Sequence, residues 1–292
     1  MRRYSIKAIL AVLAMSFTTP CASQADAAGA FDASYGEVYV QRDSGALKAD
    51  IYIPQGAGPF PGVLVVHGGA WRMGTRGQLT GVAQKLAQHG FTAVAISYRL
   101  APAYKFPAQI EDCKEAVRWM RTNAVRLKID PERIGGFGYS AGAHLVTLLG
   151  TTDAKDGLEG IADPEKAVST RLQAIAAGGA PCDFRPIPLD VDGLAFWLGG
   201  SPRQVPDQYR LASPATFVTP DDPPMFFFHG ESDRLVPLVS PTHMREKLTA
   251  AGVTAELYVV PQLGHTAACW DRTAINRSIA FLAEHLQPKE GP

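Results

Sequence analysis

The sequence predicts a single α/β domain in which a mostly parallel sheet is covered by helices on both faces and carries a small cap. First, short apolar runs such as residues 63–66 lack polar alternation, as expected of parallel strands buried on both faces. Second, these runs alternate with amphipathic stretches such as residues 107–126, where Ile110, Val117 and Met120 share one helical face. Strands that alternate with helices produce a parallel sheet with helices on both sides.

The individual elements follow in an order that fits such a sheet. We predict strands at residues 37–40, 48–53, 63–66, 91–96, 133–137, 172–177, 225–228 and 256–260. We predict helices at residues 79–88, 107–126, 141–149, 242–251 and 272–286.

Two stretches interrupt this alternation. Residues 151–170 are polar and rich in Gly and Asp, and residues 181–224 combine many Pro and Gly residues with large aromatic side chains. Both follow predicted strands at the edge of the sheet where α/β proteins place their sites. Because long connections in compact domains are usually functional lids or disordered segments, the aromatic residues favour a small ordered cap at 181–224.

The first 27 residues are typical of a signal peptide. Three basic residues precede an apolar stretch at residues 8–17, which is too short to span a bilayer, and an A-x-A cleavage site ends at Ala27. A lipoprotein acylated at Cys21 is an alternative that the preceding Thr-Thr-Pro disfavours. We therefore predict a periplasmic or secreted protein whose single catalytic domain spans residues 28–292, with no stable membrane span.

The charge pattern excludes one class of partner. The chain has 28 basic and 28 acidic residues without a basic block, so nucleic acid is not expected as a partner. The sequence has no H-E-x-x-H and no C-x-x-C motif, and we predict no metal and no cofactor.

The sharpest motif is Gly138-Tyr139-Ser140-Ala141-Gly142, which matches G-x-S-x-G between a predicted strand and a predicted helix. In that context the motif forms a strained turn that pushes the serine out at the carboxyl edge of the sheet, with the positive end of the helix directed at the same place. The motif predicts Ser140 as a nucleophile.

Residues of the same segment also match the fingerprint of dinucleotide-binding proteins. Gly136, Gly138 and Ala141 fit G-x-G-x-x-A after a strand. That motif should lead into a second strand, whereas the predicted helix here runs into the polar residues 151–157. The nucleotide interpretation is therefore disfavoured.

A glycine-rich loop follows an earlier strand. His67-Gly68-Gly69-Ala70-Trp71 comes directly after residues 63–66. An acyl-transfer enzyme needs backbone N–H groups directed at the oxyanion, and a loop at this place supplies them together with the residue after the nucleophile.

Asp233 and His265 complete the set. Each follows a predicted strand, so both should lie at the carboxyl edge beside Ser140, and the chain order Ser, Asp, His suits an acyl-transferring triad. Glu231 follows the same strand as Asp233, and Asp221 and Asp222 lie just before that strand, which makes the choice of carboxylate an inference from position.

Together these motifs resemble known enzymes. The segments at residues 67–71, 97–102, 106–112, 136–142, 229–237 and 264–265 are similar to the hormone-sensitive-lipase-like and bacterial feruloyl-esterase-like branches of the α/β-hydrolases. The resemblance covers about residues 35–286 and implies the α/β-hydrolase fold. It also implies an oxyanion hole formed by the amides of Gly69, Ala70 and Ala141.

The resemblance leaves the substrate open. Ala70-Trp71 gives the H-G-G-x-W form, which feruloyl-esterase-like proteins share with kynurenine formamidases, and the export signal favours the esterase. We expect a serine carboxylesterase acting on short-chain or aryl esters, feruloyl or acetyl in type, on small molecules or glycans. A formamidase, lactonase or peptidase of the same fold, or a non-catalytic binding protein, are the alternatives.

Two further expectations concern side chains around the site. We expect Trp71, Tyr139, Phe184 and Trp197 to line the substrate pocket and to restrict it to short acyl groups. Of the cysteines after the leader, Cys182 and Cys269 should both lie on the active-site side, whereas Cys113 lies in a helix. We predict a Cys182–Cys269 disulfide and a free Cys113.

Overall fold

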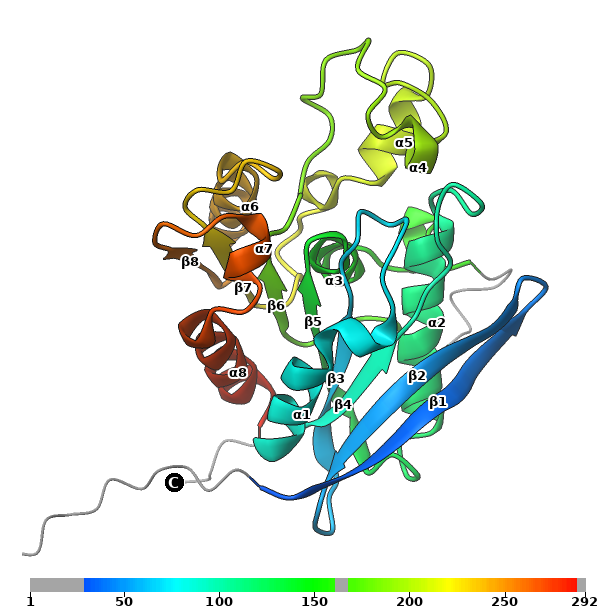
Figure 1. Cartoon of the computed structure of the whole chain (residues 1–292), viewed down its shortest axis with the longest axis vertical. Helices are drawn as coiled ribbons and strands as arrows, with labels where there is room; N and C mark the ends of the chain where they lie inside the picture. The colour runs from blue at the N-terminus through cyan, green and yellow to red at the C-terminus, as the bar shows by residue number, and fades with distance from the viewer. Residues whose placement is uncertain (1–28, 161–167, 288–292) are drawn as a thin grey trace, which may run out of the picture.

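The computed structural model describes residues 29–160 and 168–287, and its centre is an eight-stranded sheet in the order β1-β2-β4-β3-β5-β6-β7-β8 (Figure 1). The predicted leader lies outside the described residues. The strands are β1 (Phe31–Arg42), β2 (Gly45–Pro54), β3 (Phe60–Val66), β4 (Thr92–Ile96), β5 (Ile129–Tyr139), β6 (Ile175–Gly178), β7 (Met225–Gly230) and β8 (Ala255–Val260). β2 pairs antiparallel with both β1 and β4, and every other pairing is parallel, which confirms the predicted sheet.

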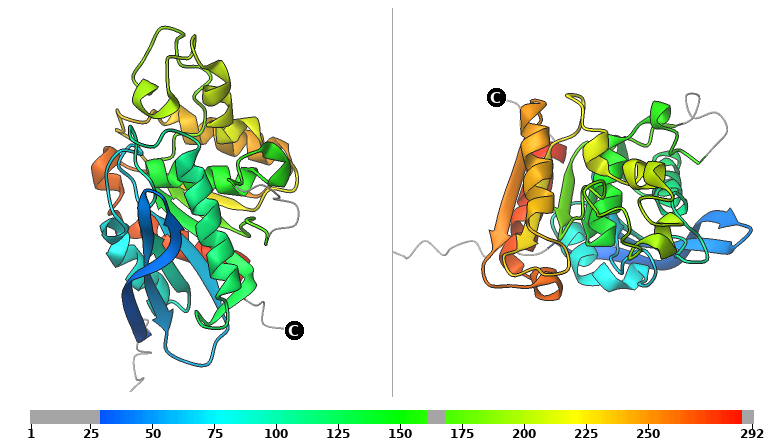
Figure 2. Two further views of the ribbon diagram at one scale, coloured as in Figure 1. Left: turned by 90° about the vertical axis from the view of Figure 1, so that its right-hand side faces the viewer. Right: turned by 90° about the horizontal axis from the view of Figure 1, so that it is seen from above.

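Helices cover both faces of this sheet (Figures 1 and 2). The longer helices are α1 (Thr80–Gln88), α2 (Ala108–Thr122), α3 (Ala141–Thr151), α6 (Val239–Ala250) and α8 (Arg272–Leu286). Apolar residues of α2, α3 and α6 belong to one buried cluster, and those of α1 and α8 belong to a second cluster on the other face.

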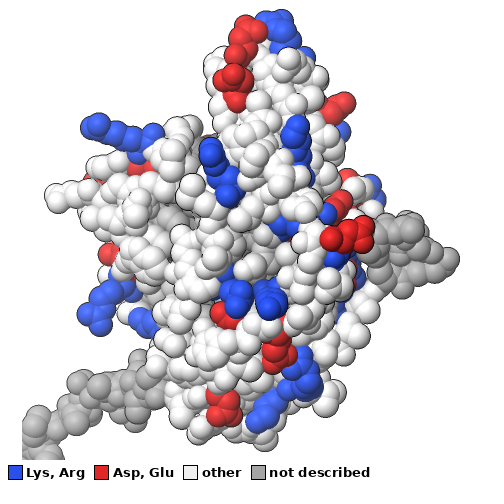
Figure 3. Space-filling model, turned by 45° about the vertical axis from the view of Figure 1, so that its right-hand side comes forward, with Lys and Arg blue, Asp and Glu red and all other residues white. Residues whose placement is uncertain are grey.

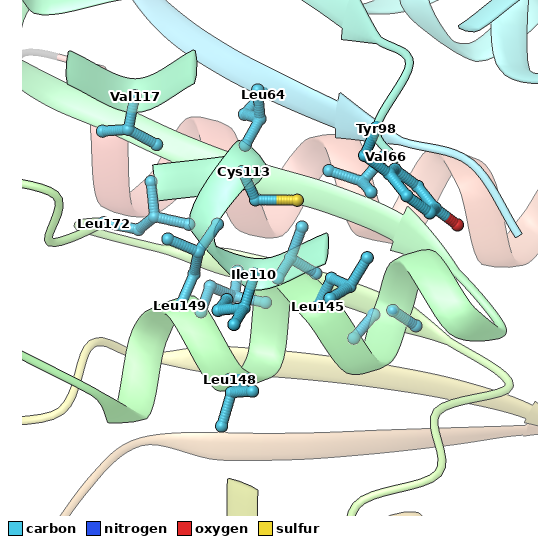
Figure 4. Close-up of a cluster of buried hydrophobic side chains, with 14 of the residues drawn as sticks. Leu64, Val66, Tyr98, Ile110, Cys113, Val117, Leu145, Leu148, Leu149 and Leu172 are labelled. Carbon is cyan, nitrogen blue, oxygen red and sulfur yellow. The ribbon is translucent and has the colours of Figure 1, made fainter. Parts of the chain in front are cut away.

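The central strands are apolar on both sides because they contribute side chains to both buried clusters. In β3, Leu64 and Val66 join the cluster under α2 and α3, while Val63 and Val65 join the cluster under α1 and α8. Figure 4 shows Leu64 and Val66 among side chains of the first cluster. Burying a side chain of this size contributes about 1.5–3 kcal/mol, so an uninterrupted apolar run is stable only between two layers.

The first two strands are longer than the sequence predicts. β1 and β2 form a hairpin with Arg42 paired to Gly45, and Phe31 is paired to Pro54 at the other end. Much of β1 is exposed or half-buried, so its sequence carries little apolar signal outside the middle of the strand.

The segment predicted as a cap, residues 181–224, lies at the end of the molecule beyond the carboxyl ends of the strands (Figures 1 and 2). It contains three short helices, α4 (Ala195–Leu198), α5 (Pro206–Leu211) and η4 (Pro214–Thr216). Phe184 and Trp197 are buried in the same cluster as α2 and α3. The segment is therefore packed on the domain through aromatic side chains.

The second irregular stretch, beyond α3, begins with η2 (Ala154–Asp156), and residues 161–167 lie outside the described part. Glu159 is buried and forms ion pairs with Lys114 at 2.7 Å and with Arg118 at 2.9 Å. These contacts attach this connection to α2.

The surface carries interspersed charges rather than a field of one sign, as the face in Figure 3 shows. Within residues 29–160 and 168–287, no helix is long and apolar enough to cross a membrane. Among the same residues, no group of three or more His, Cys, Asp or Glu side chains could hold a metal ion.

The predicted disulfide is wrong. Cys113, Cys182 and Cys269 are all free and buried. Cys182 belongs to the cluster under α2 and α3, whereas Cys269 belongs to the cluster on the opposite face of the sheet. Both residues follow strands at the same edge, but the sheet separates their side chains. Cys113 lies in α2 among apolar side chains, where the sequence places it (Figure 4).

Candidate active site

The turn between β5 and α3 holds Ser140 in a strained conformation. Its φ is 55° and its ψ is −120°, in a region that residues with a β-carbon rarely adopt. The Ser140 N–H donates to the Gly178 carbonyl of β6 at 2.7 Å. A β-carbon on Gly142 would collide with the carbonyl oxygen of Val66, so only glycine lets α3 start this close to β3. Backbone packing against two neighbouring strands therefore presents Ser140 at the sheet edge.

Ser140, His265 and Asp233 form one hydrogen-bonded chain. His265 Nε2 lies 2.8 Å from Ser140 Oγ, and His265 Nδ1 lies 2.6 Å from Asp233 Oδ2. The Asp233 side chain is fully buried, whereas that of His265 is 12% exposed. His265 begins the short helix α7 (His265–Ala268) after β8, and Asp233 follows β7. The structure thus brings together the three side chains that the sequence singles out.

Asp233 is held by its own loop as well as by His265. Its Oδ1 accepts the backbone N–H groups of Leu235 and Val236, both at 2.9 Å. His229 Nε2 lies 3.2 Å from Asp233 Oδ2 and 2.8 Å from the Val236 carbonyl, so its N–H is shared between them. Burial lowers the pKa of His229, which favours the neutral ring. The position of His229, four residues before Asp233, suggests a residue that braces this loop, but the sequence does not predict its contact with the carboxylate.

The neighbouring carboxylates have other partners. Glu231 accepts the backbone N–H of Gln262 at 2.8 Å, and Asp222 accepts both the N–H and the hydroxyl of Thr219. Within the described residues, Asp233 is the carboxylate bonded to His265. The structure therefore selects Asp233 among the candidate carboxylates on either side of β7.

The glycine-rich loop after β3 folds back on itself. Gly69, Ala70 and Trp71 have φ values of 113°, 50° and 59°. The N–H groups of Arg72 and Met73 both donate to the Gly69 carbonyl at 3.0 Å. A β-carbon on Gly69 would collide with the Met73 carbonyl, so this turn requires glycine. No hydrogen bond within the described residues uses the N–H of Gly69 or Ala70.

This loop packs directly on the nucleophile turn. A β-carbon on Gly68 would lie 3.2 Å from Ser140 Cβ. Ala141 is the first residue of α3, where a helix leaves its N–H without an intrahelical partner and carries its positive partial charge. The N–H groups of Gly69, Ala70 and Ala141 are therefore the candidate oxyanion donors, as the resemblance implies.

His67 supports the same loop. Its ring stacks on Tyr98 with centroids 4.3 Å apart, and the Tyr98 hydroxyl donates to the His67 carbonyl at 3.1 Å. Its Nδ1 lies 2.7 Å from the Gly68 carbonyl. Burial lowers the pKa of His67 to about 4, so the ring is neutral near neutral pH.

The aromatic residues expected in the substrate pocket are packed against one another. Trp71 and Trp197 stack with centroids 3.7 Å apart, and Phe184 stands edge-on to both. Trp71 and Phe184 are each 4% exposed, and Trp197 is fully buried. The expectation that Trp197 lines the substrate pocket is therefore wrong, because the indole has no exposed surface and is stacked on Trp71.

Tyr139 also lies elsewhere than expected. Its ring belongs to the cluster on one face of the sheet, whereas Trp71 belongs to the cluster on the other face. Its hydroxyl donates to the backbone carbonyl of His265. Tyr139 therefore holds the histidine segment rather than sharing a pocket with Trp71.

Comparison with known proteins identifies the family to which this site belongs. The BD-FAE family model matches residues 49–248. The chain belongs to the BD-FAE family. This confirms the resemblance to feruloyl-esterase-like α/β-hydrolases, and the BD-FAE match includes Ser140 and Asp233 but ends before His265.

Individual relatives of this BD-FAE protein are esterases by name. It is 30% identical over 257 residues to the probable carboxylic ester hydrolase LipM of Mycobacterium tuberculosis, a match that covers 80% of this chain and 58% of LipM. The chain thus spans little more than half the length of that relative. It is 26% identical to the ethyl acetate hydrolase of Pseudomonas putida, covering 77% of this chain and 72% of the relative.

Solved structures share the fold over nearly the whole described chain. The truncated form of a carbohydrate esterase from gut microbiota superposes with a TM-score of 0.79 at 25% identity, covering 89% of this chain and 98% of the esterase. The α/β-hydrolase fold predicted from the sequence is confirmed.

Proposed function

We propose that this protein is an exported serine carboxylesterase that hydrolyses short-chain or aryl esters through an acyl-serine intermediate. The observation that carries the proposal is the hydrogen-bonded chain from Ser140 through His265 to Asp233. Ser140 lies on a strained turn beside a loop in which the N–H groups of Gly69 and Ala70 have no partner among the described residues.

The geometry supports a two-step mechanism. The Ser140 hydroxyl donates its proton to His265 Nε2 as Oγ attacks the ester carbonyl carbon. Asp233 accepts the Nδ1–H bond, which keeps Nε2 free as the base and stabilises the imidazolium that forms. The imidazolium returns the proton to the departing alkoxide, which leaves as an alcohol, and acyl-Ser140 remains.

The second step repeats the first with water. His265 removes a proton from water, whose oxygen attacks the acyl carbon, and the tetrahedral intermediate collapses to release the acid and restore the Ser140 hydroxyl. In both steps the N–H groups of Gly69, Ala70 and Ala141 are suited to receive the oxyanion. Removing one such donor typically costs about 10²–10³ in kcat.

The names of the relatives support a small ester. Ethyl acetate hydrolase has a short acyl group in its name, and the structural neighbour is a carbohydrate esterase, so acetylated sugars and aryl esters such as methyl ferulate are the first substrates to test. The packed aromatic block of Trp71, Phe184 and Trp197 favours short acyl groups, since a long chain entering there would have to displace rings already in contact.

A substrate panel tests the proposal. We expect hydrolysis of acetyl to butyryl nitrophenyl esters to exceed that of decanoyl esters, with formyl amides, lactones and peptides slower than the best ester. Ser140→Ala should stay folded, lose labelling by a fluorophosphonate probe and lose activity by about 10⁴-fold. A folded wild-type protein that neither reacts with the probe nor cleaves any ester would favour the binding-protein alternative.

Export is a separate part of the proposal, which the leader at residues 1–27 supports. Expression of the full chain in a bacterial host should give a mature protein that begins after Ala27 in the periplasm or medium. N-terminal sequencing distinguishes this from an uncleaved protein or from cleavage before Cys21.

A further inference from the structure

His144, Trp71 and Trp197 form a layered cluster between the glycine-rich loop and the cap segment. The two indoles are stacked with their planes 2° apart. The imidazole of His144 stands edge-on to both, with centroid distances of 5.2 Å and 5.3 Å. His144 and Trp197 are fully buried, and Trp71 is 4% exposed.

Hydrogen bonds determine the state of the histidine. Trp71 Nε1 donates to His144 Nδ1 at 3.1 Å, and His144 Nε2 lies 2.6 Å from the Ala212 carbonyl. An indole N–H only donates and a carbonyl only accepts, so the ring must be neutral and carry its proton on Nε2. Burial lowers the pKa of His144 to about 4, in agreement with this state.

The second indole is held from the other side. Trp197 Nε1 donates to Gln109 Oε1 of α2 at 3.0 Å, and the Trp197 carbonyl accepts the N–H of Phe106. The cluster thus joins four parts of the chain: the glycine-rich loop, α2, α3 and the cap segment at Trp197 and Ala212.

The backbone of the loop needs such support. Ala70 and Trp71 both have positive φ, where a residue with a β-carbon costs about 1–3 kcal/mol. This strain falls beside Gly69 and Ala70, whose N–H groups are candidate oxyanion donors. Because Trp71 follows Ala70 directly, the position of its side chain constrains the direction of these groups.

We infer that His144 is a positioning residue that holds the indole of Trp71 in place. Through Trp71 it directs the N–H groups of Gly69 and Ala70 at the oxyanion. Its hydrogen bond to the Ala212 carbonyl also connects the glycine-rich loop to the cap segment. The inference rests on the proposed esterase function. His144 does not touch the reacting atoms in this scheme, and its effect on the reaction passes through the loop.

The role has a kinetic signature. Misplaced oxyanion donors weaken the transition state more than the bound substrate, so kcat falls while KM changes little. For His144→Leu we expect kcat to fall by about 10–100-fold with KM within about threefold. The rate of inactivation by a nitrophenyl phosphonate, whose phosphoryl oxygen enters the same hole, should fall in parallel.

Two further variants serve as controls for His144→Leu. His144→Gln keeps one acceptor for Trp71 and one donor for Ala212, so it should recover most of kcat. Thr147→Val is the matched control, since Thr147 is buried one turn further along α3 and donates only to the Ala143 carbonyl. It should leave kcat within about twofold of the wild type.

The outcomes separate the two levels of proposal. An inactive wild-type protein would overturn the esterase function and this inference with it. If the wild type is active, a folded His144→Leu variant with unchanged kcat would overturn only the inference. A variant in which only KM rises would do the same. So would a loss of kcat in Thr147→Val as large as that in His144→Leu. If His144→Leu does not fold, Trp71→Phe removes the same hydrogen bond from its other end and must show the same fall in kcat.

Discussion

The two halves of the candidate site are built in different ways. The nucleophile half, comprising Ser140 and the loop of Gly69 and Ala70, is held by backbone packing against β3 and β6 with glycine at the points of closest approach. The acid–base half, comprising Asp233 and His265, lies on loops after β7 and β8 and is held by hydrogen bonds within and between those loops.

The difference predicts how each half responds to change. Steric packing tolerates no added atom, so substitutions that add a side chain to the glycines of the nucleophile half should act through the fold. Hydrogen bonds can be removed without changing volume, so isosteric substitutions in the acid–base half should act on turnover while the fold persists.

The largest effect should follow from Asp233→Asn. The amide keeps the shape of the carboxylate but cannot stabilise the imidazolium, and it disfavours the tautomer with Nε2 free. We expect kcat to fall by about 10³–10⁴-fold. Glu231→Gln is the matched control and should stay within about fivefold of the wild type, because Glu231 contacts Gln262 rather than His265. A larger fall in kcat for Glu231→Gln than for Asp233→Asn would show that Asp233 is not the carboxylate that supports His265.

Gly142→Ala should reveal the packing of the nucleophile half. The new methyl group would collide with the backbone of β3, which cannot move aside like a flexible side chain. We expect a loss of about 3 kcal/mol or more in the free energy of unfolding, measured by urea denaturation. Gly81→Ala is a suitable control, since its β-carbon would meet no atom within 4 Å. Equal stability of the two variants would contradict the packing argument.

Acid should destabilise the nucleophile half through its buried histidines. His67 and His144 have pKa values of about 4 in the folded protein, against about 6.5 when unfolded. Between these values the unfolded chain binds more protons, so stability falls as the pH falls from about 6.5 to about 4. At pH 4.5 we expect roughly 2–3 kcal/mol less stability from each histidine than at pH 7.

Urea denaturation of His144→Gln checks this sign. The glutamine does not titrate, so the variant should lose less stability between pH 7 and pH 4.5 than the wild type loses. An identical loss in both proteins would show that His144 contributes nothing to the acid sensitivity.

The smallest effect should come from Tyr139→Phe. The Tyr139 hydroxyl donates to the backbone carbonyl of His265, and the phenylalanine ring should remain packed against Phe228. We expect kcat to fall by about tenfold with little change in melting temperature, because one hydrogen bond contributes about 1 kcal/mol. If Tyr139→Phe instead changes the preference for acyl-chain length, Tyr139 contacts the substrate.

The sequence alone was sufficient for the fold class and for the residues of the hydrogen-bonded chain. Apolar runs, helical periodicity and the G-x-S-x-G turn are local patterns, and a parallel sheet brings the ends of its strands to one edge. Position after a strand was therefore enough to predict that Ser140, Asp233 and His265 meet.

Only the tertiary structure decided on which side of the sheet each neighbouring side chain lies. Cys182 and Cys269 follow strands at the same edge of the sheet, but their side chains lie on opposite faces. Tyr139 and Trp71 also lie on opposite faces, and Trp197 is fully buried. The face of a strand residue changes with a shift of one position, and the placement of a loop residue depends on packing between distant segments. Neither is encoded in local spacing, which is why the edge was predictable and the faces were not.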